Sequence, residues 1–177
     1  TLTHSSAASD VYKRQVEIVD CTFHATDRGL RLKTRRGRGG VIEGVSMRNV
    51  EMWDVPTPLA VNGFYFCDPD GKDDWVQNRT AAVVDETTPF LRGIRLSGVT
   101  AHRVSLAAAA VLGLPEAPIE GIWLEEFWVS YSPDATADVP LMALGVDAVR
   151  HAGVIFENAE ITGSLTRCTE DEEIAQC

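Results

Sequence analysis

The segment GLRLK, residues 29–33, carries two cationic side chains at a spacing suited to binding an anion. Apolar and charged residues alternate, so in a strand the two leucines point to one face while Arg31 and Lys33 point to the other. Two cations about 7 Å apart on a rigid strand repel each other unless an anion lies over them. Arginine can bind a carboxylate or phosphate bidentately, and lysine adds a point charge. The spacing therefore predicts a local anion site.

This pair belongs to a basic stretch in an acidic chain. Six of the sixteen lysines and arginines fall between Arg28 and Arg38, although the formal net charge is −10. The continuation TRRGRGG, residues 34–40, adds three arginines and bends the chain through three glycines. The alternative to an anion site is a solvated basic turn balanced by neighbouring carboxylates.

The sequence around the basic stretch repeats. Five segments share two apolar residues two positions apart, then a turn-prone residue, then another apolar residue. They are VEIVDCTF (16–23), VSMRNVEM (45–52), IRLSGVTA (94–101), IWLEEFWV (122–129) and VIFENAEI (154–161). The turn-prone position holds Asp20, Asn49, Gly98 and Asn158, whereas Glu126 departs from the pattern.

Short segments with period-two alternation, recurring about every 30 residues, predict an all-β fold, a right-handed parallel β-helix. The larger gap between the second and third segments predicts an insertion of about 20 residues that includes 67–80. An antiparallel sandwich would explain the short strands but not the shared motif. SLAAAAVLGLP, residues 105–115, fits either a short helix or the interior of a coil.

The length predicts a single domain, and both ends of the sequence are expected to lie outside it. SSAASDVYKRQ resembles the translated end of a sequencing-library adapter, so residues 1–15 are expected to be a non-native scar. Residues 16–165 would then be C-terminal coils of a β-helix truncated at its N-terminal side, and 166–177 an acidic tail. Cutting between coils exposes a strand edge, which predicts self-association through the N-terminal coil.

A family resemblance rests on DRGLRLKTRRGRGGVIEGVSMRNVEM, followed by VNGFYFCDPDGK and VDETTP. These segments resemble glycoside hydrolase family 28, the polygalacturonases, whose fold is a pectin-lyase-like, right-handed parallel β-helix. The resemblance implies that Arg31 and Lys33, flanking Leu32, bind the carboxylate of a galacturonic acid unit next to the scissile bond. It also implies that Tyr65 lines the same cleft. The expected partner is an acidic polysaccharide, galacturonan.

The catalytic signatures of that family are missing from this sequence. An Asn-x-Asp, an Asp-Asp and a Gly-His-Gly precede the Arg-x-Lys motif in the family, and none occurs before Arg31. Asp73 and Asp74 are adjacent but lie downstream, and His4 lacks flanking glycines. The resemblance implies inverting hydrolysis of α-1,4 galacturonan by the parent protein, which needs two carboxylates about 6.5–9.5 Å apart. No catalytic residue is assigned here, and the chain alone is predicted to be inactive.

Other function classes receive little support. The four cysteines form no CxxC and have no nearby histidine at ligand spacing, so neither a metal nor a cofactor is predicted. No apolar run approaches the length of a membrane span. Net acidity and the lack of an aromatic residue among 34–40 argue against nucleic acid. Whether Cys168 and Cys177 form a disulfide is left open by their spacing.

A non-catalytic β-helix that binds acidic polysaccharide is the alternative function. In either case a polymeric plant cell-wall substrate implies that the parent protein is secreted or periplasmic. Four tryptophans are candidates for stacking on sugars, namely Trp53, Trp75, Trp123 and Trp128. Trp123 and Trp128 fall inside the strand motifs, where packing is the expected role.

Overall fold

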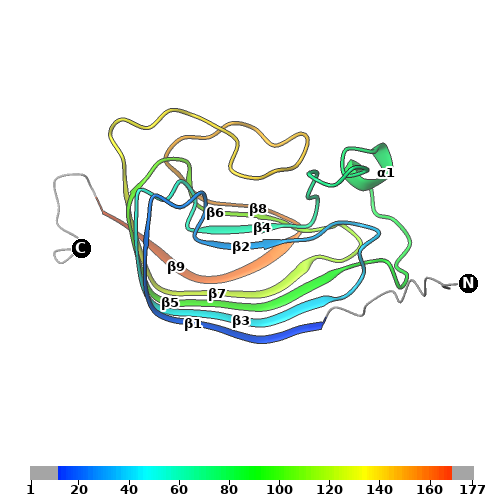
Figure 1. Ribbon diagram of the computed structural model, residues 1–177, viewed down its shortest axis with the longest axis horizontal. Coiled ribbons are helices and arrows are strands. Elements are labelled where there is room, and N and C mark those ends of the chain that lie inside the picture. Colours follow the sequence, from blue (N-terminus) through cyan, green and yellow to red (C-terminus); the bar gives the residue numbers. More distant parts are fainter. Residues whose placement is uncertain (1–11, 169–177) are drawn as a thin grey trace, which may run out of the picture.

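The computed structural model describes residues 12–168 and consists of two parallel sheets. Long strands form the first sheet in the order β1 (Tyr12–His24), β3 (Val41–Trp53), β5 (Phe90–Val104), β7 (Ile119–Tyr131) and β9 (Ala159–Cys168). Short strands form the second, in the order β2 (Leu30–Lys33), β4 (Leu59–Asn62), β6 (Ala107–Leu112) and β8 (Ala152–Glu157). The two sheets alternate along the chain, each of the first four long strands being followed by a short one (Figure 1). The all-β prediction is confirmed, and the antiparallel sandwich is wrong.

The predicted repeat matches the register of the long strands over four of its five segments. Val16 pairs with Val45, Val45 with Ile94, and Ile94 with Ile122. The fifth segment, 154–161, was assigned incorrectly. Val154 pairs with Ala109 in the short-strand sheet, and the residue opposite Ile122 is Ile161. Period-two alternation is the same in both sheets, so it could not show that this segment crosses from β8 to β9.

Stacked residues in the left-handed conformation bend the long strands at equivalent points. Asp20, Asn49, Gly98 and Glu126 have φ of 55°, 53°, 60° and 50°. Glu126, expected to depart from the pattern, therefore shares the conformation of its neighbours. Asn49 Nδ2 donates to Asp20 Oδ1 at 2.6 Å, which offsets part of the cost of positive φ at both residues.

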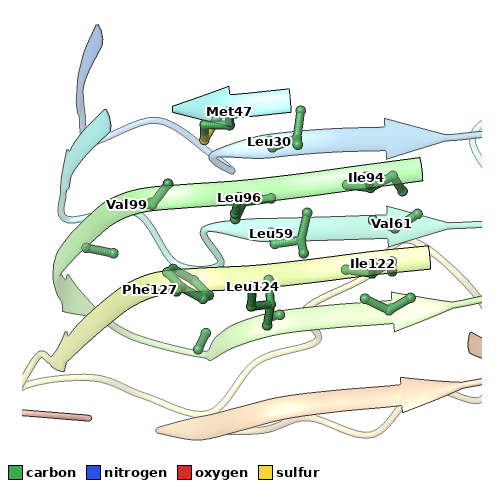
Figure 2. Close-up of a cluster of buried hydrophobic side chains, with 14 of the residues drawn as sticks. Leu30, Met47, Leu59, Val61, Ile94, Leu96, Val99, Ile122, Leu124 and Phe127 are labelled. Atoms are coloured by element: carbon green, nitrogen blue, oxygen red, sulfur yellow. The ribbon is translucent and has the colours of Figure 1, made fainter. Parts of the chain in front are cut away.

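The core lies between the two sheets. Leu59 and Val61 of β4 face the buried Ile94 and Leu96 of β5, and Leu30 of β2 is 5% exposed (Figure 2). All six residues of β6 are buried, which resolves the choice left open for 105–115 in favour of a strand. Its alanines fit because β6 is covered on both faces, and tertiary packing then overrides their helix propensity.

Two loops extend from this framework. The first, between β4 and β5, contains the predicted insertion and the four-residue helix α1 (Asp74–Gln77). The second, between β7 and β8, lies on the outer side of the short-strand sheet (Figure 1). Within residues 12–168 no helix is long and apolar enough to cross a membrane.

The ends of the described region differ from the boundaries expected from sequence. Strand β1 begins at Tyr12, inside the segment 1–15, and continues without interruption past Val16. Strand β9 runs to Cys168, beyond the expected end of the coils at 165. The rest of the expected scar, most of the expected acidic tail and the Cys168–Cys177 pairing lie outside the described residues.

Candidate functional site

The candidate site is on the outer face of β2, the terminal strand of the short-strand sheet. Parallel pairing places Arg31 opposite Ala60 and Lys33 opposite Asn62, while Leu30 is buried on the inner face. Both cations therefore share the face that points away from the core, as their alternation predicts. Because β2 ends the sheet, no described strand lies on its other side.

Tyr65 completes this group from the loop that follows β4. Lys33 Nζ donates to Tyr65 Oη at 3.0 Å and lies 4.2 Å from the ring centre, while Arg31 Cζ is 6.0 Å from that centre. The Tyr65 backbone N–H donates to the Thr34 carbonyl at 3.1 Å, which ties the loop to the end of β2. The structure thus brings the three residues singled out from sequence together.

Their ionic partners distinguish the two cations. Arg31 Nη1 donates to Asp27 Oδ2 at 2.8 Å, and Arg31 Nη2 contacts Met142 Sδ at 2.9 Å. Lys33 is exposed and has no carboxylate partner among residues 12–168, although every other cation from Arg28 to Arg38 has one. An exposed lysine without such a partner can accept an external anion without first breaking an ion pair.

Arg35 and Arg38 are balanced by the insertion. Arg35 Nε donates to Asp68 Oδ2 at 2.7 Å and its Nη2 to Asp70 Oδ1 at 2.6 Å, while Arg38 Nη2 lies 2.6 Å from Asp68. The Arg35 hydrogen bond is the main reason that the pKa of Asp68 lies below its ordinary value; burial opposes the shift and Arg38 adds to it. For these two arginines the explanation by neighbouring carboxylates is confirmed.

Arg36 is buried beneath the insertion. Its guanidinium binds Glu116 through both nitrogens that face it, at 2.6 and 2.8 Å, and the two side chains are 7% and 3% exposed. Its remaining donors reach backbone carbonyls of the insertion, at Trp75, Val76, Asn78 and Thr80. Burial alone would raise the pKa of Glu116, but the hydrogen bonds and charge of Arg36 outweigh it and lower that pKa. Arg36 therefore anchors the insertion.

Residues 139–146, here called the covering segment, close the outer face of the sheet beyond β2. Leu141 and Ala143 of this segment pack with Ala110 and Leu112 of β6. Asn62 Nδ2 donates to the Met142 carbonyl at 3.0 Å, which holds the covering segment over the end of β4. The outer face of β4 and β6 is therefore covered, while Lys33 on β2 stays exposed.

Two hollows flank the Lys33 side chain. The crevice that Lys33 shares with Arg31, Tyr65 and Met142 has a volume of about 10 Å³, enough for a single water. A second hollow of about 320 Å³ is lined by Lys33, Arg38 and Phe90, among others, and approaches the size of small-ligand pockets.

Some contributors could not be found by sequence reasoning. Asp27 lies four residues before Arg31, a spacing that could have indicated the pair. Asn62 and Met142 gave no local signal, because they reach the site through sheet pairing and through a loop far along the chain. Among residues 12–168, no three His, Cys, Asp or Glu side chains gather to hold a metal ion.

The tryptophans differ from expectation in one case. Trp123, expected to pack, is 47% exposed on the outer face of β7, and Trp75 in α1 is 49% exposed. Trp128 is half-buried, and Trp53 stacks on His102 with ring centres 3.8 Å apart. Alternation in a strand fixes which residues share a face but not whether another element covers that face.

Comparison with known proteins identifies the family. Residues 3–140 match the model of Glycosyl hydrolases family 28. The chain belongs to this family. No curated protein and no solved structure matches it. Membership in glycosyl hydrolase family 28 confirms the resemblance seen in the sequence. Glycan hydrolysis is the activity of that family, and the two parallel sheets are consistent with its fold.

Proposed function

We propose that this chain is the substrate-binding, C-terminal part of a polygalacturonase-like hydrolase that acts on α-1,4 galacturonan. In this proposal the two sheets are coils of a right-handed parallel β-helix, and the parent protein is secreted or periplasmic. The observation that carries the proposal is Lys33, an exposed cation without a carboxylate partner in the described chain, set against Tyr65 on the open end of the sheet. Family membership supports a glycan as its ligand.

A galacturonate carboxylate is the group that this site would hold. It would bind Lys33 Nζ directly and receive further attraction from Arg31, whose charge is shared with Asp27. Tyr65 is 8% exposed, so it would act mainly by orienting Lys33, whose Nζ donates to the Tyr65 hydroxyl. Charge-assisted hydrogen bonds to a carboxylate are stronger than neutral ones, so Lys33 should contribute most of the binding energy.

Binding residues of this kind do not complete the reaction. An ammonium and a guanidinium group are very weak acids, so neither donates a proton readily at neutral pH. Inverting hydrolysis needs a carboxylic acid to protonate the leaving oxygen and a carboxylate to activate water. We assign both to coils of the parent that would stack on the free edge of β2. An upstream reading frame with Asn-x-Asp, Asp-Asp and Gly-His-Gly would support this, and release of reducing ends from polygalacturonate by the purified 177-residue chain would contradict it.

Binding of polygalacturonate to the Lys33→Ala variant tests the assignment. Loss of one charge-assisted hydrogen bond should weaken binding by about 10-fold at low salt. Arg95→Ala removes the same charge from the outer face of the long-strand sheet, where Arg95 pairs with Glu125, and should leave affinity unchanged. Titration calorimetry of the three proteins gives the comparison. Equal affinities for Lys33→Ala and the unaltered chain would refute the proposed site.

A further inference from the structure

Trp75 is a large aromatic side chain that is held in place yet half exposed. A Cβ added to Gly37 would lie 2.8 Å from Trp75 Cη2, so the indole ring lies directly against the backbone of the basic stretch. Gly37 has φ of +85° and donates its N–H to the Thr87 carbonyl at 3.1 Å, which fixes that backbone. With 49% of the side chain exposed, a substantial part of the indole is left without a protein contact.

Arg35 further restrains the ring. Its guanidinium carbon lies 5.8 Å from the Trp75 ring centre, within the range of a cation–π contact. Asp68 and Asp70 fix that guanidinium from the other side, as described above. The indole is therefore pre-organised, so packing a ligand on it would cost little side-chain entropy of Trp75.

A continuous row of contacts joins Trp75 to the β2 site. Asp68 binds both Arg35 and Arg38, and Arg38 Cζ lies 5.9 Å from the Tyr65 ring centre. The row thus runs from Tyr65 through the two arginines to Trp75. Arg38, with 39% of its side chain exposed, lies between the two aromatic residues, and its charge is balanced by Asp68.

The covering segment leaves this side of the site open. It occupies the outer face of β4 and β6, whereas α1 lies beyond the C-terminal ends of the short strands (Figure 1). A polymer bound at Lys33 cannot continue in contact with the covered strands. The neighbouring insertion presents the exposed Trp75 there, next to the exposed carboxylates of Asp73 and Asp74.

We propose that Trp75 is a stacking platform for a further uronic acid unit of the same polysaccharide that binds at Lys33. The apolar C–H face of that sugar packs on the exposed indole. This inference rests on the proposed function, because it assumes a galacturonan at the β2 site. The inference adds to the proposed function the prediction that affinity depends on polymer length because of Trp75 in the insertion.

The test uses the full chain with two probes, galacturonic acid monomer and polygalacturonate. Trp75→Ala should weaken polygalacturonate binding about 10-fold, the order of loss on removing an aromatic stacking contact, and leave monomer binding unchanged. Trp75→Phe should recover part of the loss. Trp123→Ala is the matched control, because Trp123 is 47% exposed but lies on β7 in the other sheet. Circular dichroism and thermal melts check that each variant is folded.

A second readout is tryptophan fluorescence. Polygalacturonate should change the emission of the unaltered chain, and the change should be lost in Trp75→Phe but kept in a Trp123→Phe variant. This measurement needs no alanine variant to fold, so a misfolded Trp75→Ala protein would leave the test intact.

The outcomes separate the two proposals. Normal polymer binding by Trp75→Ala together with weak binding by Lys33→Ala would overturn the Trp75 platform and leave the proposed function standing. Equal losses in Trp75→Ala and Trp123→Ala would also overturn it, because the effect would then not be specific to the insertion. If the unaltered chain binds neither probe, the proposed function fails and this inference fails with it.

Discussion

Lys33 and Arg36 lie three residues apart in one basic stretch but have opposite surroundings. Arg36 is buried, binds Glu116 through two nitrogens and donates to four backbone carbonyls. Lys33 is exposed and donates to a tyrosine hydroxyl. The comparison teaches that a cluster of positive charge does not by itself identify a binding site. A cation is available to an external anion only where no acidic group of its own chain already pairs with it.

Replacing Arg36 should give the largest effect. In Arg36→Met, Glu116 would stay buried without its partner, and such a loss costs about 3–5 kcal/mol in the free energy of unfolding. Lys33→Met should change the same quantity by less than about 0.5 kcal/mol, as expected of an exposed position. Urea unfolding measures both. Similar losses in the two variants would break the distinction between a structural and a free cation.

The second-largest effect should come from acid, which should reduce the stability contributed by the carboxylates that pair with Arg35 and Arg36. The pKa values of Glu116 and Asp68 are lowered in the folded chain, so at acidic pH the unfolded chain binds more protons. Their contribution to stability is present above the unfolded pKa values of about 4, and is lost as pH falls through the folded values.

Urea midpoints measured from pH 7 down to 3 should therefore fall, and more gently in Glu116→Gln, where one of the two groups no longer titrates. In Lys33→Ala the fall of the urea midpoint with pH should equal that of the unaltered chain, because Lys33 has no carboxylate partner in the described chain. An equally steep fall in Glu116→Gln would show that the Arg36 pair does not contribute to acid sensitivity.

Freeing Arg31 from its ion pair should give the smallest effect. The change should be a gain in polygalacturonate affinity, whereas the changes above are losses of stability. Asp27→Asn removes the exposed carboxylate that pairs with both Arg28 and Arg31, leaving Arg31 as a second cation without a carboxylate partner beside Lys33. Exposed ion pairs contribute about 0–1 kcal/mol, so polygalacturonate affinity should rise by up to about fivefold. Glu125→Gln makes the same charge change beside Arg95 on the other sheet and serves as the control. A rise of equal size in the control would attribute the gain to net charge alone.

The parts of the fold that follow local rules could be predicted from sequence. Alternation and a turn-prone residue gave the register from Val16 to Ile122, because each long strand repeats the same requirements. The assignment of 154–161 failed because the same alternation occurs in both sheets. The alanine-rich strand β6 was ambiguous because its conformation depends on what covers it.

The site shows the same division. Arg31 and Lys33 could be placed on one face from their spacing alone. The spacing of Asp27 could also have indicated that Arg31 is paired. The acidic partners of the other arginines could not be found, because the insertion and the turn after β6 bring them in from up to 80 residues away. Long-range pairing of charges leaves no pattern in the local sequence.

The position of β2 at the end of its sheet would link ligand binding to self-association. A second copy that pairs with the edge of β2 on which no described strand lies would sit next to Arg31 and Lys33. Two events at one strand either assist or hinder each other, and thermodynamic linkage makes the influence mutual. The apparent affinity for polysaccharide should then vary with protein concentration, and the ligand should shift the balance between single and associated chains.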